Sequence, residues 1–242
     1  METVNDLPIL VCGFLGAGKS TMSARLRELG HEAEEVDGLL APSVMASDQH
    51  RRVITVVDCA NAKQHLEDPE LGSLLRRQIE AAGLIALSRG DLSDPAPVHA
   101  MVEAIADCPV IDAPHGALSA SDLDGLAASE LNALSPADDL TAKFGTLEYR
   151  GGAIFRVEQA ERLIANRPNG IERMTGILRT ESGGMEVQLA GRMRQTQDVT
   201  LPAQTELVVR WRRAETAQAQ IDLWFAEAVA DSGHRRGLFG YR

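Results

Sequence analysis

The sequence predicts an α/β protein, in which a three-layer, mostly parallel sheet is followed by a small α+β domain. In the first half, short apolar runs rich in branched residues alternate with helical patterns, as in parallel sheets buried on both faces. In the second half, apolar and polar residues alternate as in an antiparallel sheet. Apolar periodicity lapses near residues 133–142, where we place the boundary. The predicted domains are residues 1–134 and 144–232, and residues 233–242 form a tail.

The first domain is expected to alternate strands and helices. Branched apolar runs predict strands over 9–12, 53–58, 84–87 and 109–112. Apolar residues three and four positions apart predict helices over 21–29 and 71–82, and further helices are expected over 59–66, 95–106 and 119–132. Strands and helices that alternate at these lengths are typical of sheets joined by right-handed crossovers.

The second domain is expected to hold an antiparallel sheet and two helices. Alternation predicts strands over 145–150, 174–178, 185–189 and 207–211. Helical periodicity predicts helices over 157–165 and 221–228. The last helix carries an apolar stripe that we interpret as core, formed by Ile221, Trp224, Phe225 and Ala228. The tail at 233–242 is expected to be a loosely held end.

Residues 13–20 match the phosphate-binding pattern G-x-x-x-x-G-K-[ST], between a predicted strand and a predicted helix. Glycines let successive backbone N–H groups turn toward phosphate oxygens, and the N-terminus of the helix adds partial positive charge. Lys19 would bind the β- and γ-phosphates, and the Ser20 hydroxyl would ligate a magnesium ion. The alternative is a glycine-rich turn without a ligand. The nucleotide-binding residues predicted here are Gly13, Gly16, Ala17, Gly18, Lys19, Ser20 and Thr21.

Two acidic features each have two interpretations. The cluster at residues 31–35 is either a metal-binding group or a solvated connection, and we favour the connection. Asp58 ends a predicted buried strand, at the edge of the sheet where ligands of open α/β sheets bind. It is equally well explained as a cap of the following helix.

Composition narrows the class of protein. With 242 residues, 44% of them hydrophobic, the chain is long enough to bury a sizeable core. A net charge of −11 argues against a nucleic-acid partner, because phosphate backbones select basic surfaces. Three widely spaced cysteines predict neither a disulfide framework nor a thiolate metal cluster. An acidic N-terminus without a long apolar run predicts no signal peptide and no membrane span, so we expect a cytoplasmic protein.

Several stretches, in this order, resemble the CobW-type GTPases, which are nucleotide-dependent metallochaperones with a P-loop fold. The phosphate loop reads GFLGAGKST at residues 13–21, close to the family's form. Further similarity lies in residues 35–42, 53–59, 78–91, 108–116, 175–179 and 207–209. The resemblance implies a P-loop NTPase domain followed by a CobW C-terminal-like domain. It also implies GTP, with ATP as the alternative nucleotide, and Mg²⁺, for which Glu35 is a candidate ligand beside Ser20.

The sequence also departs from the family pattern. The family's C-x-C-C metal motif and its switch region, which contacts magnesium and the γ-phosphate, are replaced here by residues 31–34 alone. A strand is missing with them, so the strand at 9–12 is expected at an edge of the sheet. Where the family reads guanine with Asn-Lys-x-Asp, this chain has Ser88, Arg89 and Asp91. Asp91 and a stacking Arg89 are expected to bind the base, whereas Ser88 is too short to replace the Asn amide.

These features favour a CobW-like GTP-binding protein that couples nucleotide state to metal delivery or cofactor assembly. Hydrolysis is expected to be weak or absent, because turnover needs the switch region. The alternative is a non-catalytic nucleotide-binding scaffold that pairs with a complete homologue. A small-molecule kinase is less favoured, because the segments after the phosphate loop resemble the CobW-type family more than a kinase. The expected partners are a nucleotide and a protein, either a client or a homologous chain. No catalytic residue is predicted.

Overall fold

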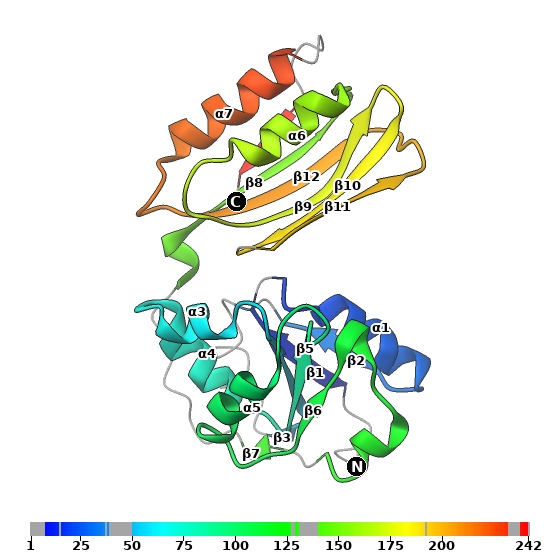
Figure 1. Cartoon of the computed structure of the whole chain (residues 1–242), viewed down its shortest axis with the longest axis vertical. Helices are drawn as coiled ribbons and strands as arrows, with labels where there is room; N and C mark the ends of the chain where they lie inside the picture. Colours follow the sequence, from blue (N-terminus) through cyan, green and yellow to red (C-terminus); the bar gives the residue numbers. More distant parts are fainter. Residues whose placement is uncertain are drawn as a thin grey trace. The chain divides into compact units, whose positions relative to one another are not determined.

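The computed structural model describes residues 8–14, 16–36, 38, 50–126, 129–130, 140–191, 193–231 and 238–241. The chain divides into two compact units, Met1–Leu140 and Thr141–Arg242. Each unit has its own sheet and its own hydrophobic core (Figure 1).

The first unit contains a five-stranded parallel sheet in the order β2-β1-β4-β5-β6. Its strands are β1 (Ile9–Gly13), β2 (Ala33–Glu35), β4 (Val53–Asp58), β5 (Leu84–Ser88) and β6 (Val110–Asp112). The α-helices described in this unit are α1 (Lys19–Glu28), α3 (Ala62–Glu67), α4 (Leu71–Glu80) and α5 (Ala96–Glu103). The parallel sheet confirms the α/β fold class predicted for this half of the chain.

Both faces of this sheet are buried. Every residue of β1, β4 and β5 is buried, as expected for strands covered on two sides. Val11 of β1 lies in one apolar cluster with Leu26 of α1. The next residue, Cys12, points to the opposite face and lies in a second cluster with Ala81, which follows α4. The sheet is therefore a central layer, with helical residues on each side of it.

The prediction that the first strand lies at an edge of the sheet is wrong, because β2 pairs with β1 in parallel. This strand is three residues long, and the side chains of Glu34 and Glu35 are exposed. Exposed consecutive glutamates are typical of a solvated connection, which is the interpretation favoured for residues 31–35 from the sequence. The pairing of β2 with β1 depends on backbone hydrogen bonds and not on apolar side chains. The last of these bonds joins the Val36 N–H to the Val11 carbonyl at 3.0 Å.

The predicted helix over 119–132 is wrong for the residues that the structure describes there. Residues Ala120–Leu123 form a single 3-10 turn, labelled η3, which Ser119 and Asp122 cap reciprocally. Gly125 follows with a φ of 90°, a left-handed conformation that an α-helix cannot continue. Further on, β7 (Ser129–Glu130) pairs antiparallel with β3 (His50–Arg51), a two-stranded ladder that periodicity did not reveal.

The second unit contains a six-stranded antiparallel sheet in the order β11-β10-β9-β12-β8-β13. Its strands are β8 (Phe144–Gly151), β9 (Ile171–Thr180), β10 (Gly183–Ala190), β11 (Met193–Val199), β12 (Thr205–Arg212) and β13 (Leu238–Tyr241). The helices α6 (Val157–Ala165) and α7 (Gln218–Asp231) lie together on one face of it (Figure 1). Their apolar sides enclose a core that includes Trp211 and Phe225. The apolar stripe predicted for the last helix, which contains Phe225, therefore faces this core.

Two strands of this sheet differ from the prediction. The tail expected to be loose contains β13, which pairs with β8 through four residues from Leu238 to Tyr241. The strand β11 was not predicted at all, because five of its seven residues are exposed and polar. Both strands lie at edges of the sheet, where a strand needs no apolar face to be paired.

Candidate functional site

The glycine-rich stretch forms a tight loop between β1 and α1. Gly13, Gly16 and Gly18 have φ angles of 136°, 80° and 101°, in the region that favours glycine. A Cβ atom at Gly13 would lie 2.4 Å from the Val56 carbonyl oxygen of β4. Glycine is therefore required at position 13 for two reasons, its backbone angle and its close approach to the neighbouring strand.

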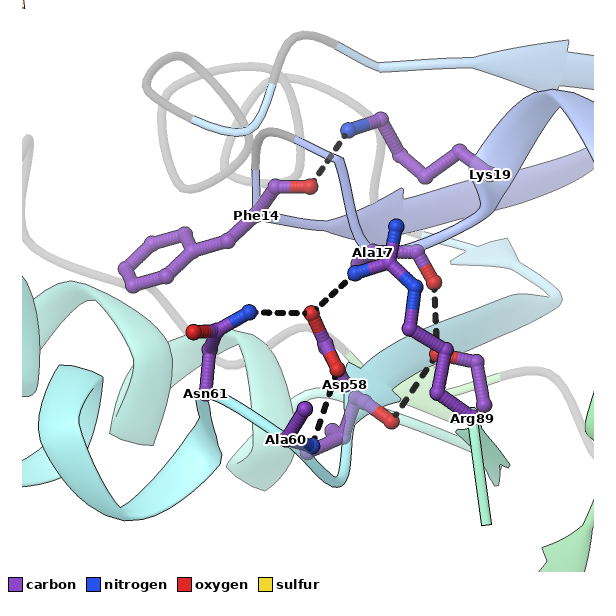
Figure 2. A network of polar contacts seen from close by, with 9 residues as sticks. Phe14, Ala17, Lys19, Asp58, Ala60, Asn61 and Arg89 are labelled. Carbon is purple, nitrogen blue, oxygen red and sulfur yellow. Dashed lines mark hydrogen bonds and ion pairs between the residues drawn. The ribbon is translucent and has the colours of Figure 1, made fainter. Parts of the chain in front are cut away.

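Lys19, the first residue of α1, turns back into the loop (Figure 2). Its Nζ atom donates to the carbonyl oxygens of Gly13 and Phe14 at 2.8 and 3.1 Å. The side chain is buried, at 9% exposure. An ammonium group is thus held inside the loop, at the N-terminus of a helix whose partial positive charge also favours anions.

Ser20 and Glu35 lie side by side, although 15 residues separate them in the chain. The Ser20 hydroxyl donates to the Glu35 carboxylate at 2.9 Å. Residue Glu35 reaches this position because β2 runs parallel to β1, with Glu35 opposite Val11. A hydroxyl and a carboxylate are oxygen ligands of the kind that Mg²⁺ prefers, so the two predicted metal ligands fit the ion in chemistry and in position.

The loop is supported from behind by buried polar contacts. Ser88, at the end of β5, donates from Oγ to the Ala17 carbonyl at 2.7 Å. Gln78 of α4 donates from Nε2 to the Gly38 carbonyl at 2.5 Å. A Cβ atom at Gly38 would lie 2.5 Å from the Gly13 carbonyl oxygen, so this glycine packs directly against the loop. Ser88 therefore has a structural role that its position in the guanine-reading segment did not suggest.

Asp58 is engaged by its own turn and by Arg89 (Figure 2). Its carboxylate accepts from the Ala60 N–H at 2.9 Å and from the Asn61 amide at 2.7 Å. Arg89 donates to the same carboxylate, whose side chain is only 4% exposed. Of the two interpretations of Asp58, the local turn accounts for the contacts seen. Arg89 is held in a left-handed conformation, with a φ of 58°.

Asp91, the other predicted base-reading residue, lies near the turn that follows β6. This turn is η2 (Pro114–Gly116), a short 3-10 segment. The His115 Nε2 atom is 3.3 Å from Asp91 Oδ2. Thr21, in the first turn of α1, is next to the same segment, because a Cβ atom at Gly116 would lie 3.0 Å from Thr21 Cγ2. The sequence had not singled out His115.

Thiol chemistry is not favoured at this site. Burial raises the pKa of the Cys12 thiol to about 12, and burial together with Asp58 raises that of Cys59 to about 11. Both groups stay protonated at neutral pH and are poor ligands and nucleophiles there. Within the described ranges, no group of three or more histidine, cysteine, aspartate or glutamate residues is placed to hold a metal ion.

A parallel sheet with a phosphate-binding loop between its first strand and first helix is the arrangement of P-loop NTPase-like domains. No protein-family model matches the sequence, and no curated protein matches it.

Among solved structures, the chain is similar to Zn(II)-bound YjiA GTPase from E. coli and to a Zn(II)-bound triple mutant of YjiA GTPase. Each is 14% identical, with a TM-score of 0.35, and the match covers 92% of this chain and 99% of that chain. Values this low do not show a shared family.

Across the described part of the chain, none of the helices is both long and apolar enough to cross a membrane.

Proposed function

We propose that this chain binds a nucleoside triphosphate in the loop between β1 and α1, with GTP as the first candidate and ATP as the second. The observation that carries the proposal is the position of Lys19. Its buried ammonium group bonds to carbonyls of its own loop, at 2.8 Å from Gly13, where it can exchange those partners for phosphate oxygens. Residues Gly16, Ala17, Gly18 and Thr21 complete the loop and the first turn of the helix.

Ser20 and Glu35 would hold the Mg²⁺ ion that accompanies the nucleotide. The ion would neutralise charge on the phosphate oxygens. The hydrogen bond between the two side chains, at 2.9 Å, shows that their oxygens converge on one place beside the loop. Mg²⁺ usually keeps several waters and takes one or two protein ligands, so two side chains suffice.

We further propose that the protein acts as a CobW-like GTP-binding protein in metal delivery or cofactor assembly, with slow hydrolysis or none. Phosphoryl transfer needs a segment that orients the attacking water, and only residues 31–34 stand where the family has its switch. A scaffold that holds nucleotide while paired with a complete homologue differs from this only in the steps after nucleotide binding.

The direct test measures binding of GTP, ATP and GDP by calorimetry, with and without Mg²⁺. Lys19→Ala is expected to lower nucleotide affinity at least about 100-fold, because charge-assisted hydrogen bonds to phosphate are lost. Lys63→Ala is the matched control, since Lys63 is exposed and pairs only loosely with Glu67 at 3.9 Å. Absence of nucleotide binding by the unmodified protein would contradict the proposal.

Phosphate release separates the remaining alternatives. Tight GTP binding without release fits a switchless protein. Fast release by the chain alone would contradict slow hydrolysis, and release that requires a small-molecule acceptor would indicate a kinase.

A further inference from the structure

The turns that follow β5 and β6 meet beside the phosphate loop. These strands are adjacent and parallel, so their carboxyl ends lie at the same edge of the sheet. Ser88, at the end of β5, bonds to Ala17 of the loop at 2.7 Å. Gly116, after β6, packs against Thr21 of α1. Both turns therefore adjoin the loop, and a nucleotide held there by its phosphates can extend its base toward them.

Arg89 is committed to a buried partner within this region. Its guanidinium pairs with Asp58, whose side chain is 4% exposed, and Figure 2 shows it directed at that carboxylate. A buried carboxylate that lost its cation would be strongly destabilised, so the pair is expected to persist when a nucleotide binds. The guanidinium is then not available to stack on a base.

His115 is exposed, whereas the guanidinium of Arg89 is paired with a buried carboxylate. Its side chain is 84% exposed, and its Nε2 atom lies 3.3 Å from Asp91 Oδ2. Its φ is 53°, in the left-handed region that residues other than glycine seldom adopt. Backbone conformations of this kind occur often at ligand-binding positions, and here the exposed ring lies next to Gly116, which packs against Thr21 of α1.

We infer that His115 contacts the base of the bound nucleotide, next to Asp91, which the family resemblance already assigns to the base. The imidazole ring stacks on the face of the base, as histidine does with unpaired bases. Asp91 Oδ2 lies 3.3 Å from the imidazole Nε2, and the other carboxylate oxygen, Oδ1, would accept a hydrogen bond from an N–H of the base. Stacking serves either purine, whereas the carboxylate favours guanine, whose edge offers two adjacent donors. This inference rests on the proposed function.

The test compares nucleotides with inorganic tripolyphosphate, which has phosphates and no base. In the full chain with Mg²⁺, His115→Ala is expected to lower GTP and ATP affinity about tenfold by loss of stacking, and to leave tripolyphosphate affinity unchanged. His115→Phe keeps an aromatic face and is expected to restore most of the GTP affinity. The matched control is His99→Ala, which removes another histidine paired with an aspartate, Asp112, at 3.0 Å, and is expected to change nothing.

Several results would overturn the inference. Unchanged GTP affinity in His115→Ala would show that the ring does not contact the base. An equal loss for GTP and tripolyphosphate would show a structural role. A loss specific to nucleotides in Arg89→Ala but not in His115→Ala would assign stacking to Arg89. Each of these leaves the proposed function intact, whereas failure of the unmodified protein to bind any nucleotide would remove both.

Discussion

Gly13 is the last residue of β1 and lies opposite Val56 of β4. Its φ of 136° is one that residues with a side chain rarely adopt. A Cβ atom there would also lie 2.4 Å from the Val56 carbonyl oxygen, which is backbone and cannot move aside. The residue that begins the phosphate loop therefore admits no side chain, for reasons of conformation and of space.

Gly13→Ala is expected to lower the free energy of unfolding of the first unit by about 2–4 kcal/mol, from backbone strain plus the forced contact. Gly30→Ala is the matched control, because Gly30 also has a positive φ, 88°, but a Cβ atom there meets nothing within 4 Å. That variant is expected to lose only about 1 kcal/mol. Far-UV circular dichroism in urea measures both, and equal losses would show that the contact with Val56 costs nothing.

At the scale of residues, the phosphate loop could be predicted from sequence because its requirements are local. Glycines at fixed spacing, a lysine and a serine follow one another within eight positions. The pair of His115 with Asp91 could not be predicted in this way, because it depends on two strands being neighbours in the sheet. An isolated histidine in a sequence carries no sign of such a neighbour.

At the scale of elements, β2 brings a carboxylate to the phosphate loop. Its consecutive glutamates make separate contacts, because successive side chains of a strand point to opposite sides. Glu35 accepts from Ser20 at 2.9 Å, and Glu34 pairs with Arg51 at 3.3 Å. A shift of one residue in the pairing with β1 would exchange these roles.

Glu35→Gln is expected to reduce the gain in GTP affinity that Mg²⁺ provides by about tenfold, because a neutral amide is a weaker ligand for a hard cation. Affinity measured in the absence of Mg²⁺ is expected to stay the same. Glu34→Gln, one residue away on the other side of β2, is the control and should keep the full gain. A loss of similar size in both variants would point to general electrostatics instead of ligation.

Strands were predictable where burial shaped their composition. The fully buried β1, β4 and β5 have the continuous apolar runs that reveal such strands. The sheet edges β2, β11 and β13 are paired through their backbones, and the exposed polar residues of β2 and β11 resemble loop sequence. The predicted helix over 119–132 failed for a different reason, because Gly125 interrupts it with a left-handed conformation.

At the scale of the whole molecule, the second unit has a core of its own. Nineteen buried residues of one cluster, including Tyr149, Trp211 and Phe225, all lie within Thr141–Arg242. Both tryptophans of the chain, Trp211 and Trp224, belong to this unit, so tryptophan fluorescence reports its unfolding selectively.

A fragment of residues 141–242 is therefore expected to fold alone and to unfold cooperatively in urea, followed by tryptophan fluorescence. Removing residues 238–242 from it should lower its free energy of unfolding by about 1–3 kcal/mol, because β8 loses the ladder from Leu238 to Tyr241 and becomes an edge. A fragment that unfolds without a cooperative transition would show that the second unit depends on the first.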